Sequence, residues 1–231
     1  MAKNTDKVGA VCLLSGGLDS CVTFAIAHSE CSFVIPLHVT YGQRTSAREK
    51  TAFTAICDFY GCKEKLHIEM PHIGQIGGSS LLSGGPDVPF AKEAQSPDGI
   101  PSTYVPFRNG TLLAIAAGLA EVRGAERIYI GAVEEDSSGY PDCRLSFFKA
   151  FDKAIDEGTR PGTKIEIATP VIGLAKKEIV KRGTSLNAPL HLSWSCYRED
   201  ANACGTCDSC MLRLRAFKAA GIEDPIPYLE G

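Results

Sequence analysis

The sequence predicts an α/β fold in which a doubly wound parallel sheet is followed by a cysteine-rich tail. Two observations lead to this expectation. Short apolar runs alternate with stretches whose apolar residues recur at helical spacing, and such alternation is typical of parallel strands joined by crossover helices. Four of the ten cysteines lie within fifteen positions, from Cys196 to Cys210, while the other six are scattered. We therefore expect a core domain over residues 1–183 and a tail over residues 184–231.

The alternating pattern assigns strands and helices in order along the chain. Apolar runs predict five strands, at residues 8–14, 33–41, 65–70, 127–132 and 164–169. Amphipathic stretches predict helices at residues 19–30, 46–60, 109–123, 145–157 and 174–182, with a last helix in the tail at 208–220. Glycine follows each of these helices except the first, and we expect the stops to be Gly61, Gly124, Gly158, Gly183 and Gly221.

Residues 71–101 interrupt this pattern. The segment contains Gly77-Gly78, Gly84-Gly85-Pro86 and Ser96-Pro97-Asp98-Gly99, and it has no sustained period of a strand or a helix. Long irregular segments of this kind are usually functional or disordered. We expect a mobile flap over the active site, with a plain surface insertion as the alternative.

Composition and charge limit the classes of function. The 231 residues include 24 Lys and Arg against 27 Asp and Glu, so a formal net charge of −3 gives no global attraction to nucleic acid. The longest apolar stretch, residues 112–120, is far shorter than the roughly 18 residues that cross a bilayer, and the N-terminal pattern is not that of a secretory signal. We expect a cytoplasmic protein with reduced thiols that acts on a small molecule, without direct nucleic-acid or membrane partners.

A phosphate-binding loop is predicted where the first strand ends. The run Ser15-Gly16-Gly17-Leu18-Asp19-Ser20 follows Leu14 and opens the first helix, where free amide groups and the helix dipole attract an anion. The glycines allow close approach of phosphate, the serines add hydroxyl donors, and Asp19 is placed to hold the loop or a Mg²⁺ ion. The run lacks the lysine of a Walker A loop and the spacing of a dinucleotide fingerprint. The alternative is a tight turn in which Asp19 only caps the helix.

This run resembles the PP-loop of the N-type ATP pyrophosphatases. The resemblance implies an adenine nucleotide alpha hydrolase-like fold, ATP bound with Mg²⁺ by residues 14–20, and catalytic roles for Asp19 and Ser20. It also implies a reaction that adenylates a substrate oxygen and releases pyrophosphate. Backbone amides at a helix N-terminus suit that reaction, because they stabilise charge on a departing pyrophosphate without reorganising.

The clustered cysteines predict a metal site in the tail. Cys196, Cys204, Cys207 and Cys210 include two C-x2-C spacings, which let neighbouring thiolates reach one tetrahedral ion. We expect one structural Zn²⁺ per chain, since four thiolates leave no open position for chemistry. A redox dithiol and an iron–sulfur cluster are the alternatives.

Three polar runs fall where a strand ends or a loop begins, which is where open α/β sheets bind ligands. They are Tyr41-Gly42-Gln43-Arg44, Tyr104-Val105-Pro106-Phe107-Arg108-Asn109 and Ser137-Ser138-Gly139-Tyr140-Pro141-Asp142-Cys143-Arg144. We expect Arg44 and Arg108 to bind phosphate or carboxylate as catalytic groups. Asp142 could accept two N–H groups from a guanine-like edge, and Tyr140 or Phe107 could stack on a flat ring. Solvated loops, with Asp142 capping the helix that begins near Leu145, are the alternative.

These runs and the tail together resemble the 7-cyano-7-deazaguanine synthase family of the queuosine pathway, over residues 11–228. The resemblance implies conversion of 7-carboxy-7-deazaguanine and free ammonia to the 7-cyano compound through adenylated intermediates, in a homodimer. It implies that the substrate contacts are Gln43, Arg108, Asn109, Tyr140, Asp142 and Arg144. The chain departs from the family pattern at Arg198-Glu199-Asp200, where a glycine-rich pair is expected, and in the length of residues 77–99.

Two other functions remain open from the sequence. One is a PP-loop tRNA-modifying enzyme of the thiolase or lysidine synthetase type, and the other is a nucleotide-binding regulator with a zinc ribbon. The net charge and the confinement of the paired cysteines to the tail count against the first of these. The five histidines show no spacing of a ligand set, and we expect Cys143 to be a small packed residue.

Overall fold

The computed structural model describes residues 7–90, 100–134 and 139–229. A single five-stranded sheet lies at the centre, with the strand order β3-β2-β1-β4-β5 and every neighbouring pair parallel. The strands are β1 (Gly9–Leu13), β2 (Phe33–Thr40), β3 (Leu66–Glu69), β4 (Arg127–Ile130) and β5 (Glu166–Ala168). The chain fills one side of β1 first and then crosses to the other side, so the predicted doubly wound fold is confirmed. The carboxyl ends of β1 and β4 therefore form a switch point, where such sheets bind ligands.

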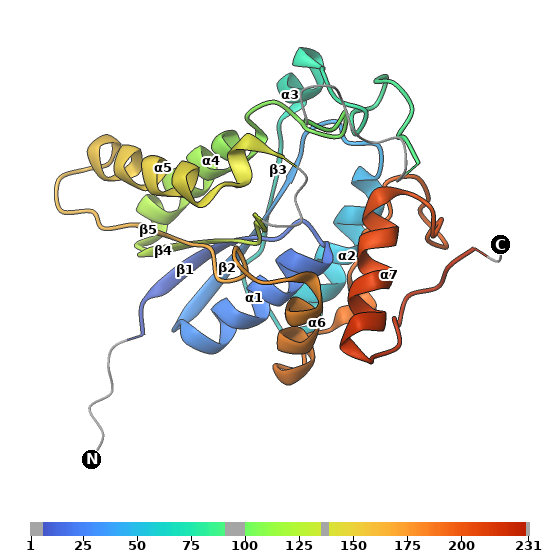
Figure 1. The fold of residues 1–231 in the computed structure, drawn as a ribbon. Helices are drawn as coiled ribbons and strands as arrows, with labels where there is room; N and C mark the ends of the chain where they lie inside the picture. The colour runs from blue at the N-terminus through green and yellow to red at the C-terminus, as the bar shows by residue number, and fades with distance from the viewer. Residues whose placement is uncertain (1–6, 91–99, 135–138, 230–231) are drawn as a thin grey trace.

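The helices cover both faces of the sheet. They are α1 (Leu18–Glu30), α2 (Ser46–Phe59), α3 (Pro71–Ile76), α4 (Arg108–Arg123), α5 (Leu145–Gly158), α6 (Lys176–Ser185) and α7 (Asp208–Ala220). Figure 1 shows α4 and α5 against one face and α1 and α6 against the other, with α7 beside α6. Short 3₁₀ turns occur at Pro141–Cys143 and Leu190–Leu192. No helix among the described residues is both long enough and apolar enough to span a bilayer.

The central strand β1 is buried on both sides, which explains its uninterrupted apolar sequence. Val11 and Leu13 point into the core under α4 and α5, whereas Ala10 and Cys12 point into the core under α1. The same alternation continues in β2, where His38 faces the second core. Because side chains alternate at every residue of a strand, two separate cores fix the register of the sheet.

The predicted strands and helices agree with the structure to within two residues, with two exceptions. Gly183 does not end its helix, because α6 continues through it to Ser185. A β-carbon at Gly183 would lie 2.8 Å from the Cγ2 atom of Val22 and 3.0 Å from the Cδ2 atom of Leu190. The glycine therefore serves close packing of α6 against α1 rather than termination.

The irregular segment is the second exception. Residues 71–101 were expected to lack regular structure, but α3 begins at Pro71, whose missing amide donor is tolerated in the first turn, and buries Ile73. The described residues 79–90, which we call the strap, connect two parts of the chain. The strap pairs with Gln43 at Leu82 and with Cys207 at Phe90. Part of the predicted flap, residues 91–99, lies outside the described residues.

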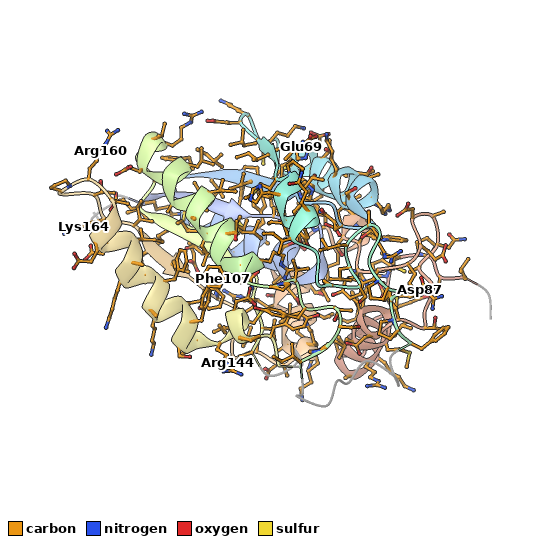
Figure 2. The ribbon with its side chains drawn as sticks, turned by 90° about the horizontal axis from the view of Figure 1, so that it is seen from above. Glu69, Asp87, Phe107, Arg144, Arg160 and Lys164 are labelled. Atoms are coloured by element: carbon orange, nitrogen blue, oxygen red, sulfur yellow. The ribbon has the colours of Figure 1, made fainter. Side chains whose placement is uncertain are left out.

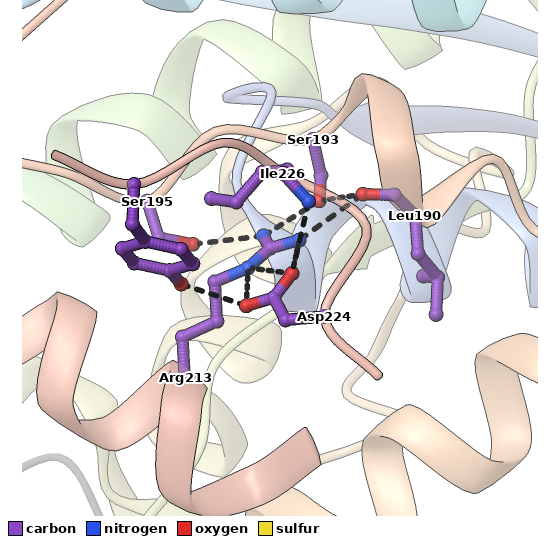
Figure 3. A network of polar contacts seen from close by, with 7 residues as sticks. Leu190, Ser193, Ser195, Arg213, Asp224 and Ile226 are labelled. Atoms are coloured by element: carbon purple, nitrogen blue, oxygen red, sulfur yellow. Dashed lines mark hydrogen bonds and ion pairs between the residues drawn. The ribbon is translucent and has the colours of Figure 1, made fainter. Parts of the chain in front are cut away.

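A buried ion pair holds the tail together (Figure 3). Arg213 of α7 is 1% exposed at its side chain, and its Nε and Nη2 atoms donate to the Asp224 carboxylate at 2.9–3.1 Å. Its Nη1 atom donates to the hydroxyls of Ser193 at 2.8 Å and Ser195 at 3.3 Å. Its Nη2 atom also donates to the Leu190 carbonyl at 3.1 Å. One guanidinium thus joins α7, the 190–195 segment and the C-terminal segment.

We expect Arg213→Met to lower the free energy of unfolding by about 3–5 kcal/mol, because Asp224 would remain charged and buried without a partner. Arg215→Met is the matched control on the same helix, where the side chain is exposed, and should change stability by less than about 0.5 kcal/mol. Urea unfolding of both variants measures the difference. Equal effects of the two substitutions would contradict a structural role for the pair.

Candidate active site

A cleft of about 290 Å³ opens where β1, β2 and β4 end. Its walls come from the loops after β1 and β2, the first turns of α4 and α6, and the tail. The structure therefore gathers residues that are far apart in the sequence. Predicted site residues that line the cleft are Leu14, Ser15, Gly17, Leu18, Asp19, Ser20, Gln43, Arg44, Arg108, Asn109, Tyr140 and Cys196.

The predicted phosphate loop forms one wall of the cleft. Gly17 is the N-cap of α1 and supplies no side-chain cap, so the amides of the first helical turn keep free donors toward the cleft. The hydroxyl of Ser20 donates to the Gly17 carbonyl at 3.0 Å and lies 3.0 Å from the hydroxyl of Ser15. Gly16 has φ +92°, and a β-carbon there would lie 2.8 Å from the carbonyl oxygen of Glu49. Only glycine fits this approach of the loop to α2.

Asp19 forms an ion pair across the cleft and does not cap its helix. Its Oδ2 atom lies 2.6 Å from the Nζ atom of Lys176, in the first turn of α6. The alternative that Asp19 is a helix cap is wrong, since Gly17 occupies that position. The Oδ1 atom of Asp19 is buried and has no hydrogen-bond partner within the described ranges. Lys176 belongs to no sequence motif and was not predicted as a site residue, although a lysine in the first turn of a helix is unusual because it opposes the helix dipole.

The loop after β2 is folded around the side chain of Gln43. Its Oε1 atom accepts the Tyr41 amide at 2.8 Å, and its Nε2 atom donates to the Glu49 carboxylate at 3.0 Å. Thr45 donates to the other oxygen of Glu49 at 2.9 Å. Burial raises the pKa of Glu49, which lines the cleft and which the sequence analysis also missed. Gln43 thus joins the loop after β2 to Glu49 in the first turn of α2.

Arg44 uses most of its donors within the protein. Its Nε atom donates to the Ser80 carbonyl at 2.9 Å, and its Nη2 atom donates to the carbonyls of Gly85 and Pro86. These bonds hold the strap against the loop after β2. The expected role of Arg44 as a phosphate or carboxylate ligand stays a prediction.

Arg108 brings a positive charge to the opposite wall. Its Nη1 atom lies 3.2 Å from the Tyr41 hydroxyl, to which it donates. Among the described residues no carboxylate lies within ion-pairing distance of this guanidinium. Phe107 before it has a left-handed backbone (φ 54°), and its ring packs edge-on against Phe147, so it does not stack over the cleft as one expectation had it. Arg108 is placed to bind an anion.

Asp142 and Arg144 are not brought to the cleft wall. The Asp142 carboxylate accepts the amide of Asn109 at 2.9 Å, and the Asn109 side chain donates back to the Asp142 carbonyl at 3.0 Å. The alternative that Asp142 caps the helix beginning at Leu145 is therefore wrong, because it binds the first turn of α4. Arg144 is exposed at the start of α5 (Figure 2). The substrate contacts expected of Asp142 and Arg144 stay predictions.

Aromatic side chains supply flat walls. Tyr140 lines the cleft and its hydroxyl lies 2.6 Å from that of Thr103. Tyr41, Trp194 and Tyr197 also line it. These rings suit a planar aromatic ligand, which stacks on such faces.

The tail contacts the phosphate loop directly. The Trp194 amide donates to the Gly16 carbonyl at 2.8 Å, and the guanidinium of Arg48 lies 4.2 Å above the Trp194 ring. From the other side, the buried His38 ring contacts the Leu14 carbonyl at 3.1 Å, and burial lowers the pKa of His38 to about 4. His38, to which the sequence analysis gave no role, is therefore neutral at pH 7 and supports the strand end before the loop.

The four predicted metal ligands meet in space. The sulfur atoms of Cys196, Cys204, Cys207 and Cys210 all lie within 4.8 Å of one another, and those of Cys204 and Cys210 are 3.9 Å apart. A tetrahedral ion with Zn–S bonds of about 2.3 Å requires sulfurs about 3.8 Å apart, so the set fits Zn²⁺. Backbone amides contact the Cys196 sulfur at 3.3–3.4 Å, as they do around thiolate ligands. An ion held by these four thiolates would have a complete tetrahedral shell.

Comparison with known proteins gives one consistent family. The family model "Queuosine biosynthesis protein QueC" matches residues 9–221. The 7-cyano-7-deazaguanine synthase of Chlorobaculum parvum is 53% identical over 95% of this chain and 96% of the relative. That of Chloroherpeton thalassium is 55% identical over 95% of this chain and 96% of the relative. Among solved structures, the U34-tRNA thiolase NcsA from Methanococcus maripaludis, with its 4Fe-4S cluster, superimposes with a TM-score of 0.50 at 13% identity, covering 94% of this chain and 66% of that chain. This likeness shows a shared fold.

Proposed function

Because this chain belongs to the QueC family of queuosine biosynthesis, we propose that its cleft joins 7-carboxy-7-deazaguanine and free ammonia through adenylated intermediates. The family consists of ATP-dependent 7-cyano-7-deazaguanine synthases, and this chain is one of them. High identity over nearly the whole chain favours this function over a tRNA thiolase, a lysidine synthetase or a zinc-ribbon regulator. We also propose, from the family resemblance, a cytoplasmic homodimer.

One observation carries the proposed chemistry. The free amides at the start of α1, the ammonium group of Lys176 and the guanidinium of Arg108 all face one cleft. In the first step a carboxylate oxygen of the substrate attacks the α-phosphorus of ATP, and the bond to the β-phosphate oxygen breaks. The amides and Lys176 stabilise the charge on the departing pyrophosphate. Arg108, which has no carboxylate partner among the described residues, orients the substrate carboxylate.

The remaining steps use the same groups again. Ammonia attacks the acyl carbon, AMP leaves with the electron pair of its bond, and an amide forms. The amide oxygen is then adenylated by a second ATP, with release of a second pyrophosphate. Loss of AMP and of the nitrogen-bound protons gives the nitrile. Tyr140 and Trp194 offer faces on which the deazaguanine ring can stack during both rounds.

Two metal ions fit residues of this chain. The Oδ1 atom of Asp19, which has no hydrogen-bond partner among the residues that the structure describes, is a hard oxygen ligand beside the phosphate loop and would hold Mg²⁺. Mg²⁺ supplies charge neutralisation on the phosphates of ATP. The four tail cysteines would hold Zn²⁺, which supplies a cross-link between the 196–204 segment and the first turn of α7.

The reaction is tested by mass spectrometry of the products formed from ATP, isotope-labelled ammonium and 7-carboxy-7-deazaguanine. We expect a nitrile carrying the label, together with AMP and pyrophosphate. Formation of ADP instead of AMP, or an unlabelled nitrile formed only when glutamine is supplied, would contradict the proposed course. Transfer RNA incubated in parallel should gain no modification.

We expect Lys176→Met to lower kcat/KM for ATP about 10²–10³-fold, because one preorganised charge toward the pyrophosphate is lost. Lys177→Met is the matched control, since the neighbouring side chain is exposed and does not line the cleft. Pyrophosphate release and thermal unfolding are measured for both. A similar loss in the two variants, or a Lys176→Met enzyme with normal turnover, would contradict the assignment.

The purified protein should hold about one zinc per chain, as a closed set of four thiolates predicts. Cys204→Ser should release the zinc and destabilise the tail, because metal binding and local folding are one event at such sites. Cys62→Ser, outside the cluster, should keep the metal. Elemental analysis that finds iron with inorganic sulfide, or full zinc content in Cys204→Ser, would contradict this prediction.

A further inference from the structure

We propose that Glu49 binds ammonium in the cleft and removes a proton from it, which makes ammonia available to attack the adenylated carboxyl group. This inference rests on the proposed function, and it assigns a binding site to ammonia, the second substrate. The sequence analysis gave Glu49 no role, and neither the family match nor the names of the relatives assign it one.

Glu49 lies beside the phosphate loop. It is in the first turn of α2, and its carbonyl oxygen is the atom that a β-carbon at Gly16 would approach to 2.8 Å. Its half-buried carboxylate lines the same cleft as the loop and Arg108. A carboxyl group activated at the phosphate loop would therefore form near Glu49.

The hydrogen bonds of Glu49 leave capacity for a small cation. Gln43 donates to Oε2 and Thr45 donates to Oε1, so each carboxylate oxygen has one donor and keeps a further lone pair. Gln43 is itself fixed by the Tyr41 amide, and the carboxylate is thus held in place before any ligand arrives. No lysine or arginine nitrogen of the described residues forms an ion pair with it. The cleft carboxylate of Asp19, in contrast, is already paired with Lys176.

The environment of Glu49 also suits proton transfer. Burial raises its pKa, while the hydrogen bonds from Gln43 and Thr45 and the charge of Arg108 act in the opposite direction. The Tyr41 hydroxyl, from the loop after β2, also faces this carboxylate. A carboxylate with a raised pKa becomes a better proton acceptor, because proton transfer is more efficient when the catalytic pKa is closer to the working pH.

The chemistry requires such an acceptor. Ammonia is mostly protonated at neutral pH, and ammonium has no lone pair with which to attack. A proton passes from ammonium to a Glu49 oxygen, and the freed lone pair forms the C–N bond to the acyl carbon. The C–O bond to AMP breaks, AMP takes its electron pair, and the surplus proton of the new amide nitrogen passes to solvent. Protonated Glu49 then releases its proton to solvent, which restores the carboxylate, and atoms and charge balance without any oxidant or reductant.

A different use of the same carboxylate is recognition of the two N–H groups on the guanine-like edge. That role would also need two acceptor oxygens. The two roles differ in one respect, because recognition of the ring matters whichever nucleophile attacks. A nucleophile that is unprotonated at neutral pH therefore separates them.

The test compares ammonium with hydroxylamine, which is largely neutral at pH 7, in the wild-type enzyme and Glu49→Gln. With saturating ATP and 7-carboxy-7-deazaguanine, we expect Glu49→Gln to lose about 10²–10⁴-fold in kcat/KM for ammonium, the range of general base catalysis. Most of this loss should disappear with hydroxylamine. Formation of the adenylate, measured as pyrophosphate exchange without any amine, should persist in the variant.

Three outcomes distinguish proton transfer by Glu49 from ring recognition and from failure of the proposed function. Thr45→Val removes one hydrogen bond to Glu49 but leaves the carboxylate, so an equally selective loss with ammonium there would overturn the proposal. An equal loss of Glu49→Gln with both nucleophiles, or a loss confined to KM for the deazaguanine, would overturn it in favour of ring recognition. Absence of pyrophosphate exchange in the wild type would instead refute the proposed function.

A second variant of Glu49 tests the proposal if the first one is unstable. If Glu49→Gln does not fold, Glu49→Asp keeps a carboxylate one methylene shorter. It should slow the reaction with ammonium more than the reaction with hydroxylamine. Equal slowing of the two reactions would overturn the role of Glu49 as proton acceptor.

Discussion

The buried pair of Arg213 and Asp224 is the interaction on which the active-site wall depends. Arg213 binds the hydroxyls of Ser193 and Ser195, and the residue between them, Trp194, donates its amide to the phosphate-loop carbonyl of Gly16. The position of the loop is thus tied to a side chain on α7. A buried ion pair contributes little net stability by itself, but its directed hydrogen bonds fix one arrangement of the segments that it joins.

The metal site and the strap also hold the tail in position beside the cleft. The cysteine set begins two residues after Trp194, and its last member, Cys210, lies three residues before Arg213. Zn²⁺ bound by the four cysteines would cross-link the tail at the start of α7. The ion pair between Arg213 and Asp224 cross-links it farther along the same helix. The strap joins this end to the loop after β2, through Arg44 on one side and the pairing of Phe90 with Cys207 on the other. The strap and the tail therefore meet, and both contribute residues to the lining of the cleft.

Within the cleft, the positive groups are placed to bind anions, and the carboxylate of Glu49 is placed to bind a cation. The helix amides and Lys176 lie at the phosphate loop, and Arg108 lies on the wall formed by α4. Asp19 neutralises part of the charge of Lys176 and holds its ammonium group in place. Glu49 keeps its own carboxylate available, because its partners are neutral donors. A site that activates an anion and then admits a cationic nucleophile needs both kinds of group within reach, and the first turns of α1, α2, α4 and α6 supply them.

The sequence determined the elements with local signals. Apolar runs predicted the five strands, and the phosphate loop and the cysteine spacing predicted two sites, because turn chemistry and ligand spacing act over a few residues. The roles of the residues that make long-range contacts were decided by the tertiary structure alone. Gly183 was expected to end a helix, but close packing against Val22 requires a residue without a side chain there. The alternative for Asp142 was a cap on the helix beginning at Leu145, but its carboxylate binds the Asn109 amide, a contact across 33 positions. Lys176 and Glu49 carried no motif, and they became site residues only because parallel strands end at one edge of the sheet.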